Sequence, residues 1–378
     1  MNGIGCTIAE METRLVASTS SGAATVLWLQ DSESPVSSQT RAAGAIWPAW
    51  RPRHGTLSWS EADDRTLMVV DGKEVPGASH QPARFIGPGL PHYPLWSPDG
   101  RALAYVVPDG QSLNLRVWTV GEPDARELVS GAPIFSSWLP GGDALVVHHG
   151  ASLRIFETSS VSSPTTLSES AAGFRAPAVS GDGSRIAWAE VRSGAVHVME
   201  CDVETRAVRE LRVLPAGVAL CYAADGRLLA ASSASPESPA FASIVDVERG
   251  ASLIRSVMTA FWLSPDVTKL VTLHPSFTGD GRYQAKLWDH AGRALGATEA
   301  FVPSAQFGMV TNFFDQFSLS HPLWSADSRW FGLPGRFPTD SPHPAFSDGV
   351  QDYVWLWDTV HGVVHRRVAP GSMLTFER

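Results

Sequence analysis

Short apolar runs rich in β-branched and aromatic residues alternate with turn sequences along the whole chain. The clearest example has an apolar run that ends at Trp96, a turn over residues 97–100, and a second apolar run over residues 102–107. In this turn the proline presets φ, the aspartate can bond to its own backbone, and the glycine accepts a positive φ. The pattern predicts two antiparallel strands joined by a tight turn.

The same unit recurs at nearly constant spacing. The positions equivalent to Trp96 lie 41 to 46 residues apart, except for a last step of 61 residues, and they are Trp50, Trp96, Trp138, Val179, Tyr222, Leu263 and Trp324. Most units continue with a third alternating run and a fourth, more polar run. Four strands in about 40 to 45 residues is the pattern of a β-propeller blade.

The two ends of the chain complement each other. Residues 13–42 form a unit without its first strand, and residues 371–376 form a first strand with no unit after it. We expect the C-terminal strand to complete the N-terminal blade, which would leave no exposed sheet edge. The sequence therefore predicts an all-β fold, a single β-propeller domain over residues 1–378. Eight four-stranded blades are expected, with seven as the alternative if the weak unit at Trp50 is not a blade.

The residues 96–100 (WSPDG) resemble the repeat of TolB-like propellers, the PD40-type repeat, which also occurs in the propeller domains of prolyl oligopeptidase-type peptidases. The resemblance implies a propeller fold and no single activity. Residues 287–289 and 356–358 are similar to the Trp-Asp ending of WD40 repeats, but the upstream Gly-His pair of those repeats is absent. The sequence has no G-x-S-x-G motif, which a hydrolase nucleophile elbow would need.

Composition narrows the classes of partner. The chain carries 29 Lys and Arg against 38 Asp and Glu, a net charge of −9, which argues against binding to nucleic acid or to an anionic membrane. Its three cysteines include no C-x-x-C pair, so neither a disulfide framework nor a zinc cluster is indicated. The sequence shows no leader and no long apolar run, so we expect a cytoplasmic protein without a membrane partner. We expect no cofactor.

The largest departure from the repeat is a long connection over residues 301–321. It holds five phenylalanines and a methionine, together with several polar residues. One interpretation is a lid or apolar binding wall over the central channel, because long structured loops are often functional. The other is a segment that fills the propeller and buries its own apolar residues. The candidate ligand-binding residues here are Phe313, Phe314, Gln316, Phe317 and His321.

A second insertion, over residues 335–350, leaves the same unit between its second and third strands, and we expect it on the same face. The alternative is a tolerated surface insertion. Histidine and arginine residues at unit junctions or at the ends of second strands belong to that face as well. His92, Arg175 and His274 are therefore further candidates for ligand binding. No pair of histidines has the spacing of a metal site, and no metal is expected.

Two functions fit these features. The first is a non-catalytic binding or scaffold propeller that engages a protein, a peptide or a small ligand on its loop-rich face near the channel. The alternative is an enzyme of the hydrolase, lyase or cyclase type, acting on a small apolar substrate under residues 301–321, with Asp315, His321 and Arg336 in catalytic roles. The orientation of the phenylalanine rings, toward a pocket or into the protein, separates the two.

Overall fold

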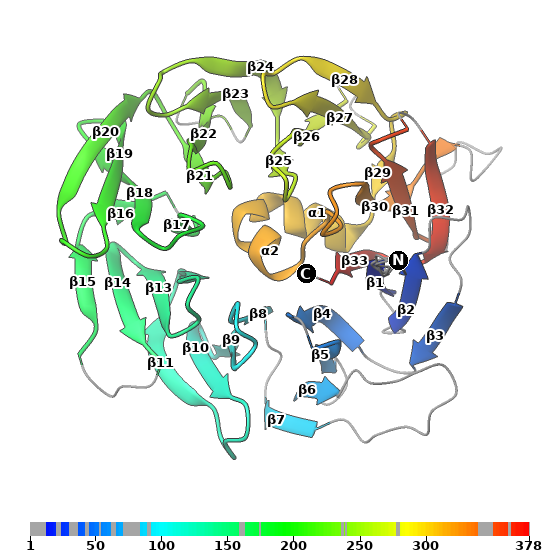
Figure 1. The fold of residues 1–378 in the computed structure, drawn as a ribbon, viewed down its shortest axis with the longest axis horizontal. Helices are drawn as coiled ribbons and strands as arrows, with labels where there is room; N and C mark the ends of the chain where they lie inside the picture. The colour runs from blue at the N-terminus through cyan, green and yellow to red at the C-terminus, as the bar shows by residue number, and fades with distance from the viewer. Residues whose placement is uncertain are drawn as a thin grey trace, which may run out of the picture.

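A computed structural model describes residues 13–19, 24–29, 37–41, 45–52, 54–61, 66–70, 84–88, 92–158, 163–173, 175–235, 238, 240–276, 280–338, 351–361 and 364–377. Its strands form eight antiparallel sheets arranged in a ring around a central axis (Figure 1). The structure confirms the predicted all-β propeller class. Eight sheets agree with the expected number of blades, and the weak unit at Trp50 is one of them.

The strands of one sheet follow one another from the axis to the rim (Figure 1). The sheet that holds both ends of the chain has β33 (Met373–Phe376), β1 (Thr13–Ser18), β2 (Ala24–Leu29) and β3 (Ser37–Arg41). The next three sheets have β4 (Ala45–Arg51), β5 (Thr56–Glu61), β6 (Thr66–Val70) and β7 (Arg84–Pro88); β8 (His92–Trp96), β9 (Ala102–Asp109), β10 (Ser112–Thr119) and β11 (Arg126–Gly131); and β12 (Ile134–Trp138), β13 (Ala144–His149), β14 (Ser152–Glu157) and β15 (Thr165–Ser168).

The fifth sheet has a divided inner strand, because β16 (Ala171–Ala172) and β17 (Ala178–Val179) both pair with the next strand outward. That sheet continues with β18 (Arg185–Arg192), β19 (Ala195–Asp202) and β20 (Val208–Leu214). The last three sheets have β21 (Val218–Tyr222), β22 (Leu228–Ser233), β23 (Phe241–Asp246) and β24 (Ser252–Met258); β25 (Ala260–Leu263), β26 (Lys269–Pro275), β27 (Tyr283–Asp289) and β28 (Ala294–Ala297); and β29 (Val302–Pro303), β30 (Trp330–Arg336), β31 (Tyr353–Asp358) and β32 (Val364–Pro370).

The repeated turn is held by its serine as much as by its aspartate. The Ser97 hydroxyl donates to Asp99 Oδ1 at 2.6 Å and accepts from the Ala102 N–H at 2.9 Å. Asp99 Oδ1 also accepts from the N–H of Arg101. The same Ser–Asp hydrogen bond recurs in the turns that begin at Ser180, Ser264 and Ser325. The turn residues therefore act in the architecture of the blade, as the sequence indicates.

The repeated tryptophan joins neighbouring blades. The indole N–H of Trp138 donates to the Leu95 carbonyl of the preceding sheet at 2.9 Å. Equivalent bonds run from Trp50 to the Thr375 carbonyl and from Trp324 to the Trp262 carbonyl, while Trp96 donates to the hydroxyl of Ser58. In the unit that has tyrosine at this position, the Tyr222 hydroxyl lies 2.6 Å from a carboxylate oxygen of Glu200, again on the preceding sheet. A buried aromatic ring with one polar atom suits this position, since it supplies both apolar contact and a directed hydrogen bond.

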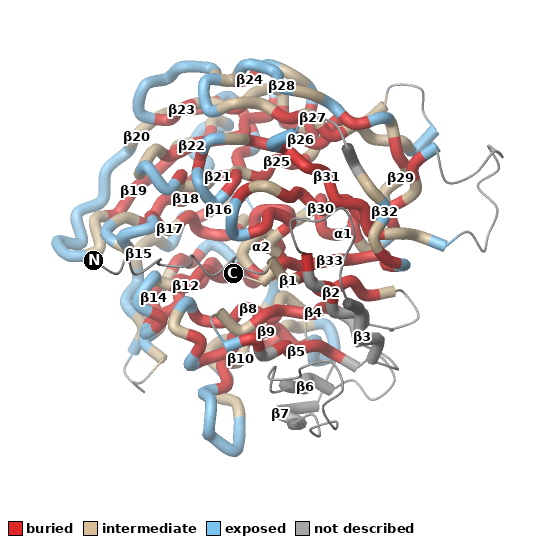
Figure 2. The backbone as a smooth tube through the Cα atoms, turned by 45° about the vertical axis from the view of Figure 1, so that its right-hand side comes forward, coloured by how far each residue is buried: buried red, intermediate tan, exposed pale blue. Residues whose placement is uncertain are grey.

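The chain ends meet in one sheet. β33 pairs antiparallel with β1, with Leu15 opposite Phe376 and Ser18 opposite Met373. This is the pairing that the complementary ends of the sequence predict. β33 and the last four residues of β1 are buried, and Figure 2 shows that buried backbone gathers near the axis while exposed backbone lies mostly at the rim and in loops.

Replacement of Phe376 by alanine measures how much the closing strand contributes. The Phe376 side chain is fully buried, so its removal leaves a cavity. We expect Phe376→Ala to lower the free energy of unfolding by about 3–5 kcal/mol in urea denaturation. Val360, which is 59% exposed on the turn after β31, gives the control Val360→Ala, with an expected change below about 0.5 kcal/mol. A loss below about 1 kcal/mol for Phe376→Ala would contradict a role of this strand in closing the ring.

Candidate functional site

Two short helices occupy the long connection before Trp324 and lie at the centre of the ring (Figure 1). They are α1 (Ala305–Asn312) and α2 (Phe314–Ser320), and we call residues 305–320 the helix pair. Ser304 caps α1 by accepting a hydrogen bond from the Phe307 N–H, as serine commonly does at a helix start. The sequence left open whether this segment forms a binding wall or fills the propeller, and it did not predict that the segment is helical.

The helix pair interrupts the innermost strand of its sheet. β29 pairs with the far end of β30, with Val302 opposite Arg336, and the chain returns so that Trp324 bridges to Phe331. The second insertion follows Arg336, which lies opposite Val302. Both insertions therefore leave the blade at the end opposite the turn that begins at Ser325. The residues of that insertion beyond Pro338 and up to 350 lie outside the described part of the chain.

The phenylalanine rings of the helix pair point into the protein. Phe307, Phe314 and Phe317 are buried, and Phe313 is half-buried. Phe314 lies 5.1 Å from the Phe261 ring, and Phe313 lies 6.0 Å from the Phe135 ring. The phenylalanine side chains therefore pack against inner strands of the propeller, which fits the interpretation of a segment that fills the propeller.

Phe317 is held by two residues with unusual backbone geometry. Its ring stacks on Trp47 at a centroid distance of 5.1 Å and lies 4.6 Å from Tyr93. Trp47 and Tyr93 have φ values of 55° and 52°, which cost bulky residues on the order of 1–3 kcal/mol each. Both sit where the pairing of an inner strand shifts in register, in β4 and in β8. The backbone strain therefore lies at Trp47 and Tyr93, the two inner-strand residues whose side chains contact Phe317 of α2.

Polar residues of α2 are bonded to the backbone of inner strands. The Gln316 side chain accepts from the Ser136 N–H at 2.8 Å and donates to the Ser136 carbonyl at 3.1 Å. Asp315 accepts from the Ala176 N–H at 2.7 Å and pairs with the Arg175 guanidinium at 2.9 Å. Gln316, a candidate ligand contact, and Asp315, a candidate catalytic residue, thus both satisfy buried backbone groups of the protein itself.

The helix pair contacts all seven of the other sheets. Besides the contacts above, Gln306 accepts a hydrogen bond from the hydroxyl of Ser372, next to β33, and α2 contacts β21. Arg175 adds a hydrogen bond to the Asn312 carbonyl and lies over the Phe314 ring at 5.6 Å. The helix pair therefore connects the inner parts of all the sheets at the axis.

Of the three predicted histidines, His92 and His321 both lie beside Trp47, whereas His274 lies apart from them in β26. His321 is fully buried, with Nδ1 2.6 Å from the Ser320 hydroxyl and its ring edge-on to Trp47, and burial lowers its pKa to about 3. His92 is half-buried beside Trp47, and burial lowers its pKa as well. His274 bonds to Thr272 and to the Val257 carbonyl, and burial lowers its pKa to about 4.

The three candidate catalytic residues each have separate partners. Asp315 pairs with Arg175, and His321 is enclosed by aromatic rings. Arg336 pairs with Asp352 at 3.3 Å, and burial raises the pKa of that carboxyl. No three His, Cys, Asp or Glu side chains of the described residues are grouped so as to hold a metal ion. Within the same residues, no helix has the length and apolar character to cross a membrane.

Sequence reasoning missed the residues that receive the helix pair, although the repeat contains a signal for them. Trp47, Tyr93 and Phe135 each stand three residues before a repeated tryptophan, and each contacts α2 or the adjoining Phe313. Ala176 and His321 stand three residues before Val179 and Trp324. Comparison of this position among the units would have marked it as the one that faces the channel.

No protein-family model matches this chain, and no curated protein matches it. A crystal structure of a eukaryotic initiation factor is 11% identical over 97% of this chain and 98% of that chain, with a TM-score of 0.58. A prolyl endopeptidase is 12% identical over 85% of this chain, which spans about half (49%) of that chain, with a TM-score of 0.57. An oligogalacturonate lyase in complex with manganese is 13% identical over 87% of this chain and 86% of that chain, with a TM-score of 0.51.

The prolyl endopeptidase and the oligogalacturonate lyase are similar to this chain in their β-propeller fold. This chain shares the fold. Identities this low show the architecture and not an activity, because one fold hosts many unrelated functions. Membership of the TolB-like, PD40-type repeat family remains a prediction from residues 96–100.

Replacement of Gln316 by methionine tests the bonds between α2 and the ring. Methionine keeps the volume of the side chain and leaves the buried N–H and carbonyl of Ser136 without their partner. We expect Gln316→Met to lower the free energy of unfolding by about 2–4 kcal/mol, measured by urea denaturation. Asn312→Ala, at an exposed position of the same helix pair, is the control, with an expected change below about 0.5 kcal/mol. Equal effects of the two variants would contradict the anchoring role.

Acid titration tests the burial of His321. Between pH 6.5 and about pH 3 the unfolded chain binds a proton at this histidine and the folded protein does not. His321 therefore lowers stability as the pH falls through this window, by at most about 1.4 kcal/mol per pH unit, and has no such effect above about pH 7.

We expect His321→Gln to remove this share of the pH dependence. The free energy of unfolding of the wild type minus that of the variant should be constant from about pH 7 to 8 and should shrink toward about pH 4. Urea denaturation at each pH measures both values. A difference that stays constant down to about pH 4 would show that His321 is protonated as readily in the folded protein as in the unfolded chain.

Proposed function

We propose that the protein is a non-catalytic binding propeller that holds a protein or peptide partner on the face where α1 and α2 lie. One observation carries the proposal: the polar side chains of α2 are bonded to inner strands, so the helix pair is a fixed part of the ring. Such a segment offers a surface and leaves its own carboxylate and amide groups occupied. A rigid, preorganised surface suits binding, since little order is lost on association.

The outward side of α1 has the character of a contact surface. Ala305, Met309 and Asn312 are exposed at positions that share one face of the helix, and Met309 is 48% exposed. No charged residue occurs in α1. Interface cores are depleted in charged residues, and methionine adapts its shape to a partner. An uncharged patch at the centre of the ring therefore supports a partner that covers the helix with an apolar segment.

The enzyme alternative places a substrate under the same residues. It would need Asp315 to leave Arg175 and His321 to leave its buried position before either side chain could reach a substrate. Displacement of the helix pair would also expose Phe314 and Phe317 to water, which costs about 1.5–3 kcal/mol for each side chain. The binding role requires no such opening, and we favour it for that reason.

Replacement of Met309 by glutamate tests the proposed surface. A charge at this exposed position leaves the fold intact and should weaken partner binding at least about tenfold, because the partner would have to bury an unpaired carboxylate. The matched control is Val360→Glu. Val360 is an exposed apolar residue just after β31, at the end of the blade where the turn at Ser325 lies. Quantitative affinity capture from cells that make the protein measures both variants against the wild type. A set of captured proteins that is unchanged by Met309→Glu would overturn the proposal.

A further inference from the structure

Gly308 lies in the middle of α1, where no described neighbour requires a glycine. Its φ is not positive, so its backbone conformation is open to any residue. A Cβ at this position would meet no described atom outside the helix within 4 Å. Most of the glycines that the structure describes have a positive φ or a close neighbour, such as Leu374 against Gly332. The protein's own packing therefore gives no reason for Gly308.

A glycine inside a helix weakens that helix. Glycine loses more backbone freedom on folding than alanine does, so alanine is the better helix former. Both backbone groups of Gly308 are already bonded, because its N–H donates to the Ser304 carbonyl at 2.8 Å and its carbonyl accepts from the Thr311 hydroxyl at 2.8 Å. A residue that works against its own element without compensation in the fold is expected at functional positions. We therefore looked for a role of Gly308 outside the folded chain.

Gly308 lies on the outward side of α1. Positions 305, 308, 309 and 312 follow the spacing of one helix face, and Ala305, Met309 and Asn312 are exposed there. Ala305 and Gly308 have the smallest side chains of this face, so the helix surface is shallow beside Met309. Another chain can approach the backbone of α1 closely at this place.

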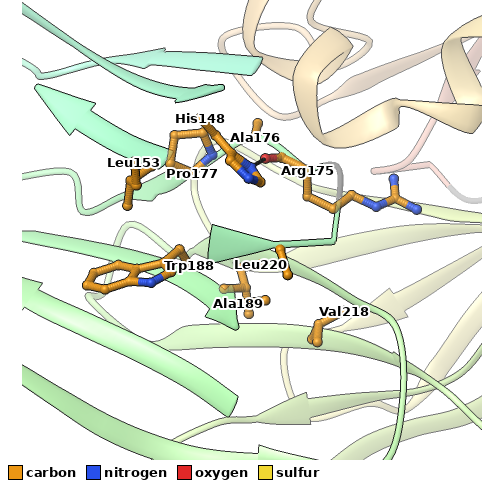
Figure 3. A pocket seen from close by; sticks show the side chains of 10 residues that line it. His148, Leu153, Arg175, Ala176, Pro177, Trp188, Ala189, Val218 and Leu220 are labelled. Atoms are coloured by element: carbon orange, nitrogen blue, oxygen red, sulfur yellow. Dashed lines mark hydrogen bonds between the residues drawn. The ribbon is translucent and has the colours of Figure 1, made fainter. Parts of the chain in front are cut away.

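The hollow beside the helix pair offers no alternative site for a partner. It is lined by His148, Arg175 and mostly apolar residues (Figure 3). It has room for roughly one water molecule, which is less than a partner side chain needs. The outward side of α1 is the better candidate for a close contact.

The chemistry of this face favours a helix of the partner over an extended strand. An extended segment has backbone N–H and C=O groups that need hydrogen-bond partners once they are buried. Ala305, Gly308 and Met309 have no strong hydrogen-bonding group in their side chains, and no residue of α1 is charged. A helix satisfies its own backbone groups, and it can pack closely at a glycine through Cα–H contacts to carbonyl oxygens.

We propose that the partner places one apolar helix across α1, with its closest approach at Gly308. This inference rests on the proposed binding function and names the element of the partner that the surface fits. The missing Cβ sets the distance between the two helices, since that distance depends on the side chains at the contact. Met309 packs beside the crossing helix.

Gly308→Ala separates what the fold needs from what the partner needs. We expect the variant to lower the equilibrium constant for unfolding about two- to fivefold in urea denaturation, because alanine favours the helix. We expect it also to reduce at least about fivefold the amount of the proteins that the wild type captures from its own cells, because the added methyl group holds the helices apart. Affinity capture with quantitative mass spectrometry measures this second effect.

Gly181→Ala is the matched control. Gly181 likewise has no positive φ and no atom within 4 Å of its Cβ position. It lies in the turn that begins at Ser180, which is equivalent to the turn at Ser325 at the other end of the blades from the insertions. The amount of each captured protein should be unchanged by this variant.

A photo-crosslinker tests which element of the partner lies on α1. Benzoylphenylalanine in place of Asn312 should attach to residues of a captured protein that recur about three or four positions apart, as on one face of a helix. Attachment to alternate residues would indicate a strand and would overturn the proposal.

Two further outcomes would overturn it. If Gly308→Ala is no more stable than the wild type, the fold itself requires the glycine. If Gly308→Ala captures as much as the wild type, no close approach occurs at this position. Reduced capture by Met309→Glu in that second case would leave the proposed function standing without this inference, whereas unchanged capture by both variants would overturn both.

Discussion

A closed ring of sheets leaves space at its axis, and in this protein two helices fill that space (Figure 1). The inner strands cannot bond to each other across the axis, so their buried groups need partners from another element. Gln316 bonds to both backbone groups of Ser136, and Asp315 bonds to the Ala176 N–H. Together with the buried phenylalanines and the hydrogen bond between Gln306 and Ser372, these bonds connect the helix pair to all seven other sheets.

A second set of bonds runs around the ring instead of through its centre. The repeated tryptophan donates to the preceding sheet in four of the units, through Trp50, Trp96, Trp138 and Trp324. The bond from Trp50 reaches the Thr375 carbonyl on β33, so it includes the strand that joins the two ends of the chain. Contacts between neighbours keep adjacent blades together, and the helix pair also joins blades that are not neighbours.

The receiving positions differ from one side of the ring to the other. Trp47, Tyr93 and Phe135 reach toward α2 and Phe313 from three successive sheets, whereas the equivalent positions of the next three sheets hold Ala176, Ala219 and Ala260. Small residues allow close approach, and on that side Phe314 packs against Phe261 and Arg175. The inner strand of the fifth sheet is also divided, into β16 and β17. The helix pair and the divided inner strand therefore both occur where the repeat is least regular.

The sequence by itself determined the propeller class, the sheet units and the pairing of the two chain ends, because alternation, turn residues and spacing are local properties. It also located the irregular segment at residues 301–321, since an interrupted period is visible without a structure. Only the tertiary structure decided that this segment is helical, that its rings point inward, and that Asp315, Gln316 and His321 are buried within the protein. The reason is physical: the partners of these side chains, such as Ser136, Arg175 and Trp47, are more than a hundred residues away in the chain. The repeat places Trp47, Tyr93 and Phe135 at equivalent positions, but it does not indicate which side chains of residues 301–321 each of them contacts.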